Sequence, residues 1–107
     1  MGKSTYLQGT VELLVLKVLS REPLHGYGIA KWIGEETGGV LALEDAALYQ
    51  GLHRMESKGW ISAEWGRTET GRKAKLYRLT KAGRKRLEAG SEGFRDYAAA
   101  VLKVLEA

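Results

Sequence analysis

The side chains best suited to chemistry in this sequence are cations concentrated in one segment. Nine of the 20 residues at positions 67–86 are lysine or arginine and only Glu69 is acidic, so this segment carries a charge of +8. The other 87 residues hold 8 basic and 12 acidic side chains, a charge of −4, so the overall +4 conceals a polarised chain. A segment of this kind attracts a polyanion, and the chemistry it indicates is the neutralisation of phosphate groups.

Other kinds of reactive site are poorly represented in the sequence. The chain has no cysteine and two histidines, His25 and His53, so neither a thiolate nor a zinc site is expected. No arrangement of nucleophile, histidine and acid stands out. We therefore expect no enzyme activity, no metal and no cofactor.

Length and composition set the class of protein. The 107 residues suffice for one domain with a modest core, and 44% hydrophobic with 28% charged residues is ordinary globular usage. The first ten residues lack the apolar core of a signal peptide, and nowhere do 18 apolar residues run consecutively. We expect a cytoplasmic protein with no membrane segment.

The elements that must position the cations follow from the apolar periodicity. Helical spacing predicts helices over residues 10–21, 25–37 and 44–58. The period then changes to two, which predicts a pair of strands on either side of a polar turn at residues 66–73. A last helix is expected from residue 81 to the end. Thr10 and Thr80 are the expected caps of the first and last helices.

This order of elements is that of a winged helix-turn-helix. The fold class expected is therefore α+β, mostly α, with a DNA-binding winged helix-turn-helix at residues 1–80. Residues 81–107 are expected to form a C-terminal dimerisation helix packed on it as part of one structural unit. In this fold the third helix enters a major groove of double-stranded DNA, and the hairpin wing lies along neighbouring phosphates.

The third predicted helix has two contrasting faces. At about 100° per residue, Leu48, Leu52 and Met55 fall on one side and form its core face. The opposite side carries small or hydrogen-bonding side chains, namely Ala46, Gln50, His53, Arg54 and Ser57.

Base discrimination is expected from Gln50, His53 and Arg54, because amide and guanidinium groups bond base edges. Phosphate contacts are expected from the wing residues Arg67, Thr70, Arg72, Lys73 and Lys75. The alternative is that cations such as Lys73, Lys75 and Arg78 only protect a sheet edge against aggregation. Nine cations against one acid exceed that need.

Four short motifs stand at fixed spacing between residues 24 and 83. They are Leu24-His25-Gly26-Tyr27-Gly28-Ile29, Leu48-Tyr49-Gln50-Gly51-Leu52-His53-Arg54-Met55-Glu56, Gly59-Trp60-Ile61 and Tyr77-Arg78-Leu79-Thr80-Lys81-Ala82-Gly83. Together they resemble the PadR family of bacterial transcriptional regulators.

The resemblance implies a winged-helix repressor that acts as a homodimer, with the C-terminal helix as its main dimerisation element. It also implies that Tyr27 approaches a phosphate and that Tyr49 stands at the DNA-facing end of the third helix. The alternative for both tyrosines is ordinary packing with the hydroxyl in water.

The expected dimer surface comes from the first and last helices. Leu13 and Leu16 lie off the buried stripe of the first helix, so a partner subunit would cover them. In the last helix Leu87, Phe94 and Val101 recur every seven residues, with Ala98 and Leu105 beside them.

Two alternatives remain open from the sequence. Trp32, Trp60 and Trp65 either pack in the core or line a cavity for a small aromatic effector, and core packing is favoured. The whole chain is either a DNA-binding regulator or a winged-helix interaction module whose basic wing meets an acidic protein.

Overall fold

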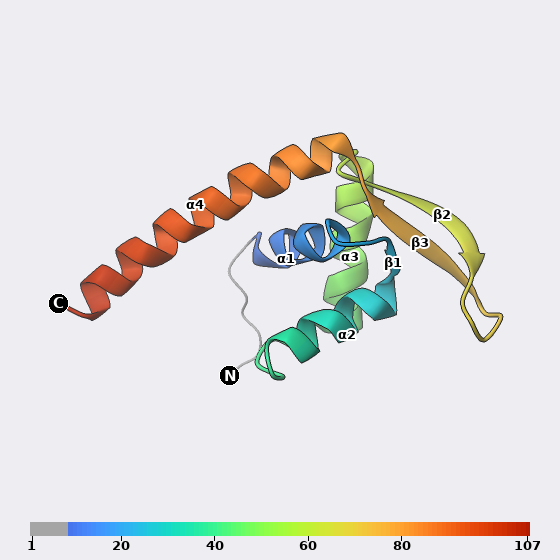
Figure 1. The fold of residues 1–107 in the computed structure, drawn as a ribbon, viewed down its shortest axis with the longest axis horizontal. Coiled ribbons are helices and arrows are strands. Elements are labelled where there is room, and N and C mark those ends of the chain that lie inside the picture. Colours follow the sequence, from blue (N-terminus) through green and yellow to red (C-terminus); the bar gives the residue numbers. More distant parts are fainter. Residues whose placement is uncertain (1–8) are drawn as a thin grey trace.

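Three helices surround a small core, and a hairpin and a long helix extend from it in opposite directions (Figure 1). The computed structural model describes residues 9–107, and the molecule measures 54 × 31 × 20 Å. The order of elements confirms the predicted winged-helix plan. The elements are α1 (Thr10–Leu19), β1 (Leu24–His25), α2 (Gly26–Glu36), α3 (Asp45–Ser57), β2 (Ile61–Arg67), β3 (Lys73–Leu79) and α4 (Lys81–Leu105).

The core lies where α1, α2, α3 and the base of the sheet meet. Each element contributes its apolar stripe, represented by Val15, Ile29, Leu48 and Ile61, all of which are nearly inaccessible to water. The predicted core face of α3 is confirmed, because Leu48, Leu52 and Met55 are at most 1% exposed. Burial of side chains of this size stabilises the fold by about 1.5–3 kcal/mol each.

The sheet has three antiparallel strands in the order β1-β3-β2, one more than expected. Strand β1 has only two residues, Leu24 and His25, which pair with Tyr77 and Leu76 of β3. Two residues are too few to show a strand period, so the sequence pattern gave no sign of this pairing. Its effect is to fasten the start of α2 to the base of the wing.

We define the wing as β2, β3 and the turn at residues 68–72 that connects them. Its strands are longer, and its turn is shorter, than expected. The ladder continues to the pair Arg67 and Lys73, so the turn excludes residues 66, 67 and 73. At the tip the amide of Thr68 donates to the carbonyl of Arg72 at 2.9 Å. Gly71 adopts φ +85°, a left-handed conformation that favours glycine.

Of the two predicted helix caps, Thr80 is confirmed and Thr10 is wrong. Thr80 is the cap of α4, because its Oγ1 accepts a hydrogen bond from the amide of Gly83 at 3.0 Å. Thr10 is wrong as the cap of α1, since Gly9 holds that position with φ +87° and Thr10 is already helical. A glycine reaches this left-handed backbone conformation at no steric cost. The helix over residues 10–21 also ends two residues earlier, at Leu19.

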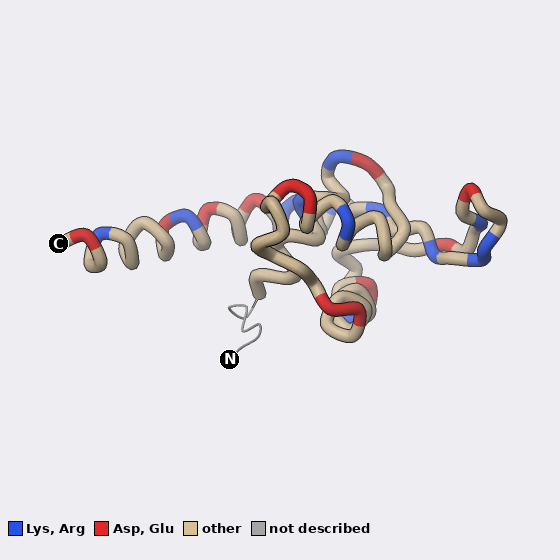
Figure 2. Tube along the Cα trace, turned by 90° about the horizontal axis from the view of Figure 1, so that it is seen from below, with Lys and Arg blue, Asp and Glu red and all other residues tan. Residues whose placement is uncertain are grey.

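The cationic run is divided between two elements. Five of its nine cations lie in the wing, whereas Lys81, Arg84, Lys85 and Arg86 lie on α4, beyond the end of β3 away from the wing tip. Figure 2 shows lysine and arginine at the far end of the wing. Within residues 9–107, no helix is long and apolar enough to cross a membrane.

Candidate nucleic-acid interface

The outward face of α3 is polar and open to solvent. Ala46, Gln50, His53 and Ser57 are all exposed, and at about 100° per residue they lie within a single sector opposite the core. Their side chains are short or end in hydrogen-bonding groups. The face therefore permits close approach of another surface and offers that surface hydrogen bonds.

One flank of α3 borders the wing. Glu56 lies on this flank, and its Oε1 is 3.5 Å from the Nζ of Lys75 on β3. Tyr49 lies about two turns earlier on the same flank, because residues seven apart share a side of a helix. The wing therefore runs beside the Tyr49 edge of the polar face.

The other flank of α3 borders α1. Arg54, expected among the base-reading residues, donates from Nε to Oε2 of Glu12 on α1 at 3.2 Å. Its guanidinium also folds back to within 3.7 Å of the position that a Cβ on Gly51 would occupy. The side chain remains 53% exposed, so it is held at the edge of the polar face farther from the wing.

The start of α2 reaches the same region through β1. His25 donates from Nδ1 to the carbonyl of Lys75 at 2.9 Å, and its ring stacks on Tyr27 at a centroid distance of 6.0 Å. Tyr27 is 60% exposed. The ring of Tyr49 approaches Gly26 so closely that a Cβ there would lie 2.5 Å from the tyrosine Oη. Glycine at this position therefore lets α2 and α3 converge beside the wing.

These elements enclose a groove of about 820 Å³, which we call the wing groove. It is lined by His25 and Tyr27 from the β1–α2 junction, Tyr49 from α3, and Trp65, Thr70, Arg72, Lys73, Lys75 and Tyr77 from the wing. Burial raises the pKa of Tyr77, and the nearby Glu56 and Tyr49 raise it further, so its hydroxyl stays neutral. The groove thus combines aromatic rings with cations.

Most of the predicted DNA-contacting residues surround this region, but not all of them line the groove. Tyr27, Tyr49 and four wing residues do. Gln50 and His53 lie on the adjoining polar face of α3. Arg67 donates from Nη1 to the carbonyl of Gly71 at 2.9 Å, so it braces the turn of the wing.

The three tryptophans do not form one aromatic cavity. Trp32 and Trp60 are half-buried against the core, beneath Arg21 and Arg86 respectively. Trp65 is 62% exposed, so core packing was the wrong expectation for it. Trp65 lies on the same face of β2 as buried Ile61, but farther along the wing, where the sheet has left the core; sequence periodicity does not show this point.

The residues expected at a dimer surface separate into two groups. Leu16 and Leu87 are only 1% and 9% exposed, so they belong to the core of the chain itself and offer little contact surface. Leu13 packs against that core and is partly buried. Phe94, Val101 and Leu105 are exposed on the second half of α4, with Ala98 half-buried among them.

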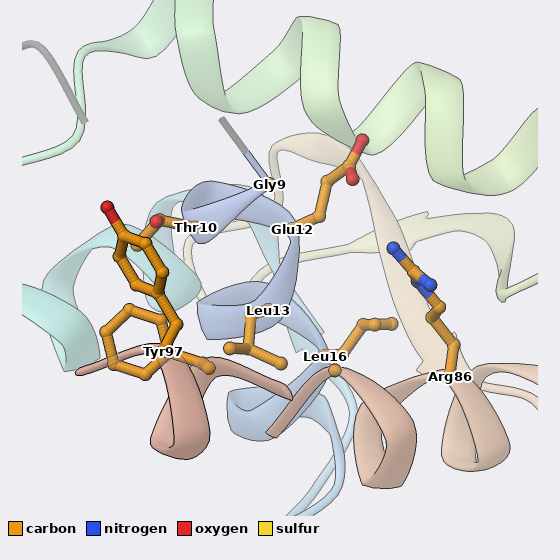
Figure 3. A pocket seen from close by; sticks show the side chains of 9 residues that line it. Gly9, Thr10, Glu12, Leu13, Leu16, Arg86 and Tyr97 are labelled. Atoms are coloured by element: carbon orange, nitrogen blue, oxygen red, sulfur yellow. The ribbon is translucent and has the colours of Figure 1, made fainter. Parts of the chain in front are cut away.

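A second cavity of about 410 Å³ lies between α1 and α4. Figure 3 shows Leu13 and Leu16 of α1 facing α4, with Glu12 and Arg86 at one end and Tyr97 at the other. Within the described part of the chain, no group of three metal-ligating side chains occurs in this cavity or elsewhere.

Comparison with known proteins identifies the family. Residues 15–89 match the PadR-like family of transcriptional regulators. The chain belongs to this family. PadR-like proteins are DNA-binding transcriptional regulators and not enzymes, in agreement with the expectation from sequence. An uncharacterized protein of Lysinibacillus sphaericus is 30% identical over 84 residues, which cover 78% of this chain and 77% of that protein.

Solved structures agree with the PadR-like assignment over nearly the whole chain. A PadR family regulator from Eggerthella lenta is 31% identical with a TM-score of 0.79, covering 94% of this chain and 85% of that one. A PadR family regulator from Clostridium difficile is 28% identical with a TM-score of 0.78, covering 91% and 99%. A transcriptional regulator from Clostridium thermocellum is 27% identical with a TM-score of 0.83, covering 91% and 94%.

Proposed function

We propose that this PadR-like regulator is a cytoplasmic, homodimeric repressor that binds a pseudo-palindromic operator in double-stranded DNA. The observation that carries the proposal is that the Tyr49 edge of the polar α3 face and the cationic wing border one groove. A helix and a hairpin so arranged would engage a major groove and its neighbouring phosphates together. Repression then requires only that the bound protein exclude RNA polymerase.

The proposal divides the contacts by chemistry. Gln50 and His53 read base edges from the centre of the α3 face, and Ala46 is small enough to meet a thymine methyl group. Arg54 reads bases only from the α1 side of the face, where Glu12 holds it. Phosphates are contacted by the wing residues Thr70, Arg72, Lys73 and Lys75. These contacts add binding affinity that does not depend on the base sequence of the DNA.

Dimerisation sets the spacing of the two half-sites. The exposed apolar residues of α4 meet those of a second copy, so two α3 helices enter successive major grooves about 34 Å apart. Tyr27 and Tyr49, which both line the wing groove, contribute hydroxyl groups to the DNA backbone that crosses it.

The test uses a duplex enriched by the wild-type protein from a random-sequence library, compared with an unselected duplex. Arg72→Ala or Lys73→Ala should weaken binding to both duplexes and reduce the slope of log K against log salt by about 0.9 per lost phosphate contact. Gln50→Ala should instead reduce the preference for the enriched duplex by about 1–3 kcal/mol and leave the slope unchanged.

Two results would contradict the proposal. Affinity that does not respond to salt would exclude the phosphate-binding role of the wing. A library that yields no preferred duplex, with weak and uniform binding throughout, would favour the alternative in which the basic wing meets an acidic protein.

A further inference from the structure

Trp65 is the residue that the proposed contacts leave unexplained. It lies near the middle of β2, opposite Lys75 on β3, and the residue is 62% exposed. The Nζ atoms of Lys73 and Lys75 lie 5.1 and 5.6 Å from the ring centroid. Tryptophan is a highly buried residue on average, and this exposed ring lines the wing groove beside two cations.

The strand register explains how this ring comes to face the groove. Side chains alternate along a strand, so Trp65 shares a face of the sheet with Ile61, and Lys75 shares it with Tyr77. Ile61 and Tyr77 are buried in the core. Farther along the wing the same face leaves the core and continues over the groove, where it carries Trp65 and the lysines.

The chemistry of this face matches that of a nucleic-acid backbone. A DNA strand alternates anionic phosphates with deoxyriboses whose carbon-rich surfaces are apolar. The two ammonium groups of Lys73 and Lys75 match the phosphates, and the indole ring beside them matches the apolar surface of a sugar. An extended segment of another protein would pair with the cations only through its carboxylates. The groove also contains the rings of Tyr27 and Tyr49, and this mixture of rings and cations suits a chain of sugars and phosphates.

We propose that Trp65 packs its indole ring against a deoxyribose of the strand that crosses the wing groove, while Lys73 and Lys75 hold the adjoining phosphates. This inference rests on the proposed DNA-binding function and extends it. The sugar contact adds affinity that is independent of base sequence, like the lysine contacts. The affinity from the lysine contacts falls as salt rises, whereas the affinity from the sugar contact does not, because no counterion is released when an uncharged ring is covered.

The first measurement separates these contributions by their response to salt. Binding of the enriched and unselected duplexes is followed over a range of salt concentration. Trp65→Ala should weaken binding to both duplexes about tenfold with the slope unchanged, and Trp65→Phe should retain most of the affinity because a ring remains. Lys73→Ala should reduce the slope by about 0.9. Arg78→Ala is the matched control, since it removes a cation from the opposite face of β3 and should alter the slope less.

The second measurement observes the ring directly. The difference in fluorescence between the wild type and Trp65→Phe isolates the emission of Trp65. Adding duplex DNA should shield that emission from acrylamide. This readout does not depend on the stability of the alanine variant.

The outcomes distinguish this inference from the proposed function. If the wild type prefers the enriched duplex but Trp65→Ala binds within about twofold of it, the sugar contact is excluded and the function stands. If Trp65→Ala lowers the salt slope as Lys73→Ala does, Trp65 acts by positioning the lysines and does not contact DNA. An indole that DNA leaves open to acrylamide overturns the contact as well. A wild type that prefers no duplex overturns the function itself.

Discussion

At the scale of single residues, Tyr77 shows how the core and the wing groove share side chains. It is only 5% exposed, yet it forms part of the groove lining. Burial is the main cause that raises the pKa of Tyr77 above the ordinary 10.0, and the nearby Glu56 and Tyr49 act in the same direction. The neutral phenol is therefore the form that the fold accommodates.

This position predicts a loss of stability in base. Because the folded protein holds the Tyr77 proton more tightly than the unfolded chain, its contribution to stability is complete below pH 10.0. The contribution is lost as pH rises from there through the higher folded pKa. Urea unfolding at about pH 9 and about pH 11 should show a smaller decline for Tyr77→Phe than for the wild type. An equal decline in the free energy of unfolding for the two proteins would show that Tyr77 has the same pKa in the folded and unfolded states.

At the scale of elements, α1 connects α3 to α4. Its Glu12 holds Arg54 of α3, and the same residue lines the cavity between α1 and α4. Gly90 of α4 approaches α1 so closely that a Cβ there would lie 3.1 Å from Leu13. The helix α1 is therefore packed against both α3 and α4.

A double-mutant cycle measures the first of these connections. Glu12→Gln and Arg54→Ala, singly and together, should give a coupling in the free energy of unfolding of about 0.2–1 kcal/mol, since the pair is only partly buried. The surface pair Lys31 and Glu35, which is 71% and 67% exposed, is the matched control and should couple more weakly. Equal coupling in the two pairs would mean that Glu12 does not fix Arg54 in solution.

The sequence predicted the elements better than their junctions. The helices and the two long strands were evident because each repeats its apolar period several times. The β1 pairing, the Gly9 cap and the contact between Glu12 and Arg54 were not predicted, because each depends on residues that meet only after folding. The wing cations were predicted to form a site from their number, whereas the exposure of Trp65 depends on where the sheet leaves the core, which became visible only in the fold.

At the scale of the whole molecule, α4 has more apolar surface than one chain covers. Its 25 residues span about 37 Å. The stripe that begins with buried Leu87 and with Gly90 against α1 continues along the same side through Phe94, Tyr97 and Val101. Phe94 and Tyr97 are exposed although they border the cavity between α1 and α4. The C-terminal end of α4 extends past α1, so nothing in the described part of the chain covers it (Figure 1). A long helix with an uncovered stripe is stabilised when another apolar surface packs against it.

A charge placed on the stripe tests whether a second copy provides that surface. Val101→Asp should convert a dimer into a monomer in sedimentation equilibrium, because a carboxylate would be buried in the interface without a partner. Ala99→Asp adds the same charge on the opposite side of α4 and should leave the mass at twice the 11.8 kDa of one chain. The monomer should bind a half-site with a salt slope about half that of the dimer on the full operator. A wild type that sediments as a monomer at micromolar concentration would remove the homodimer from the proposed function.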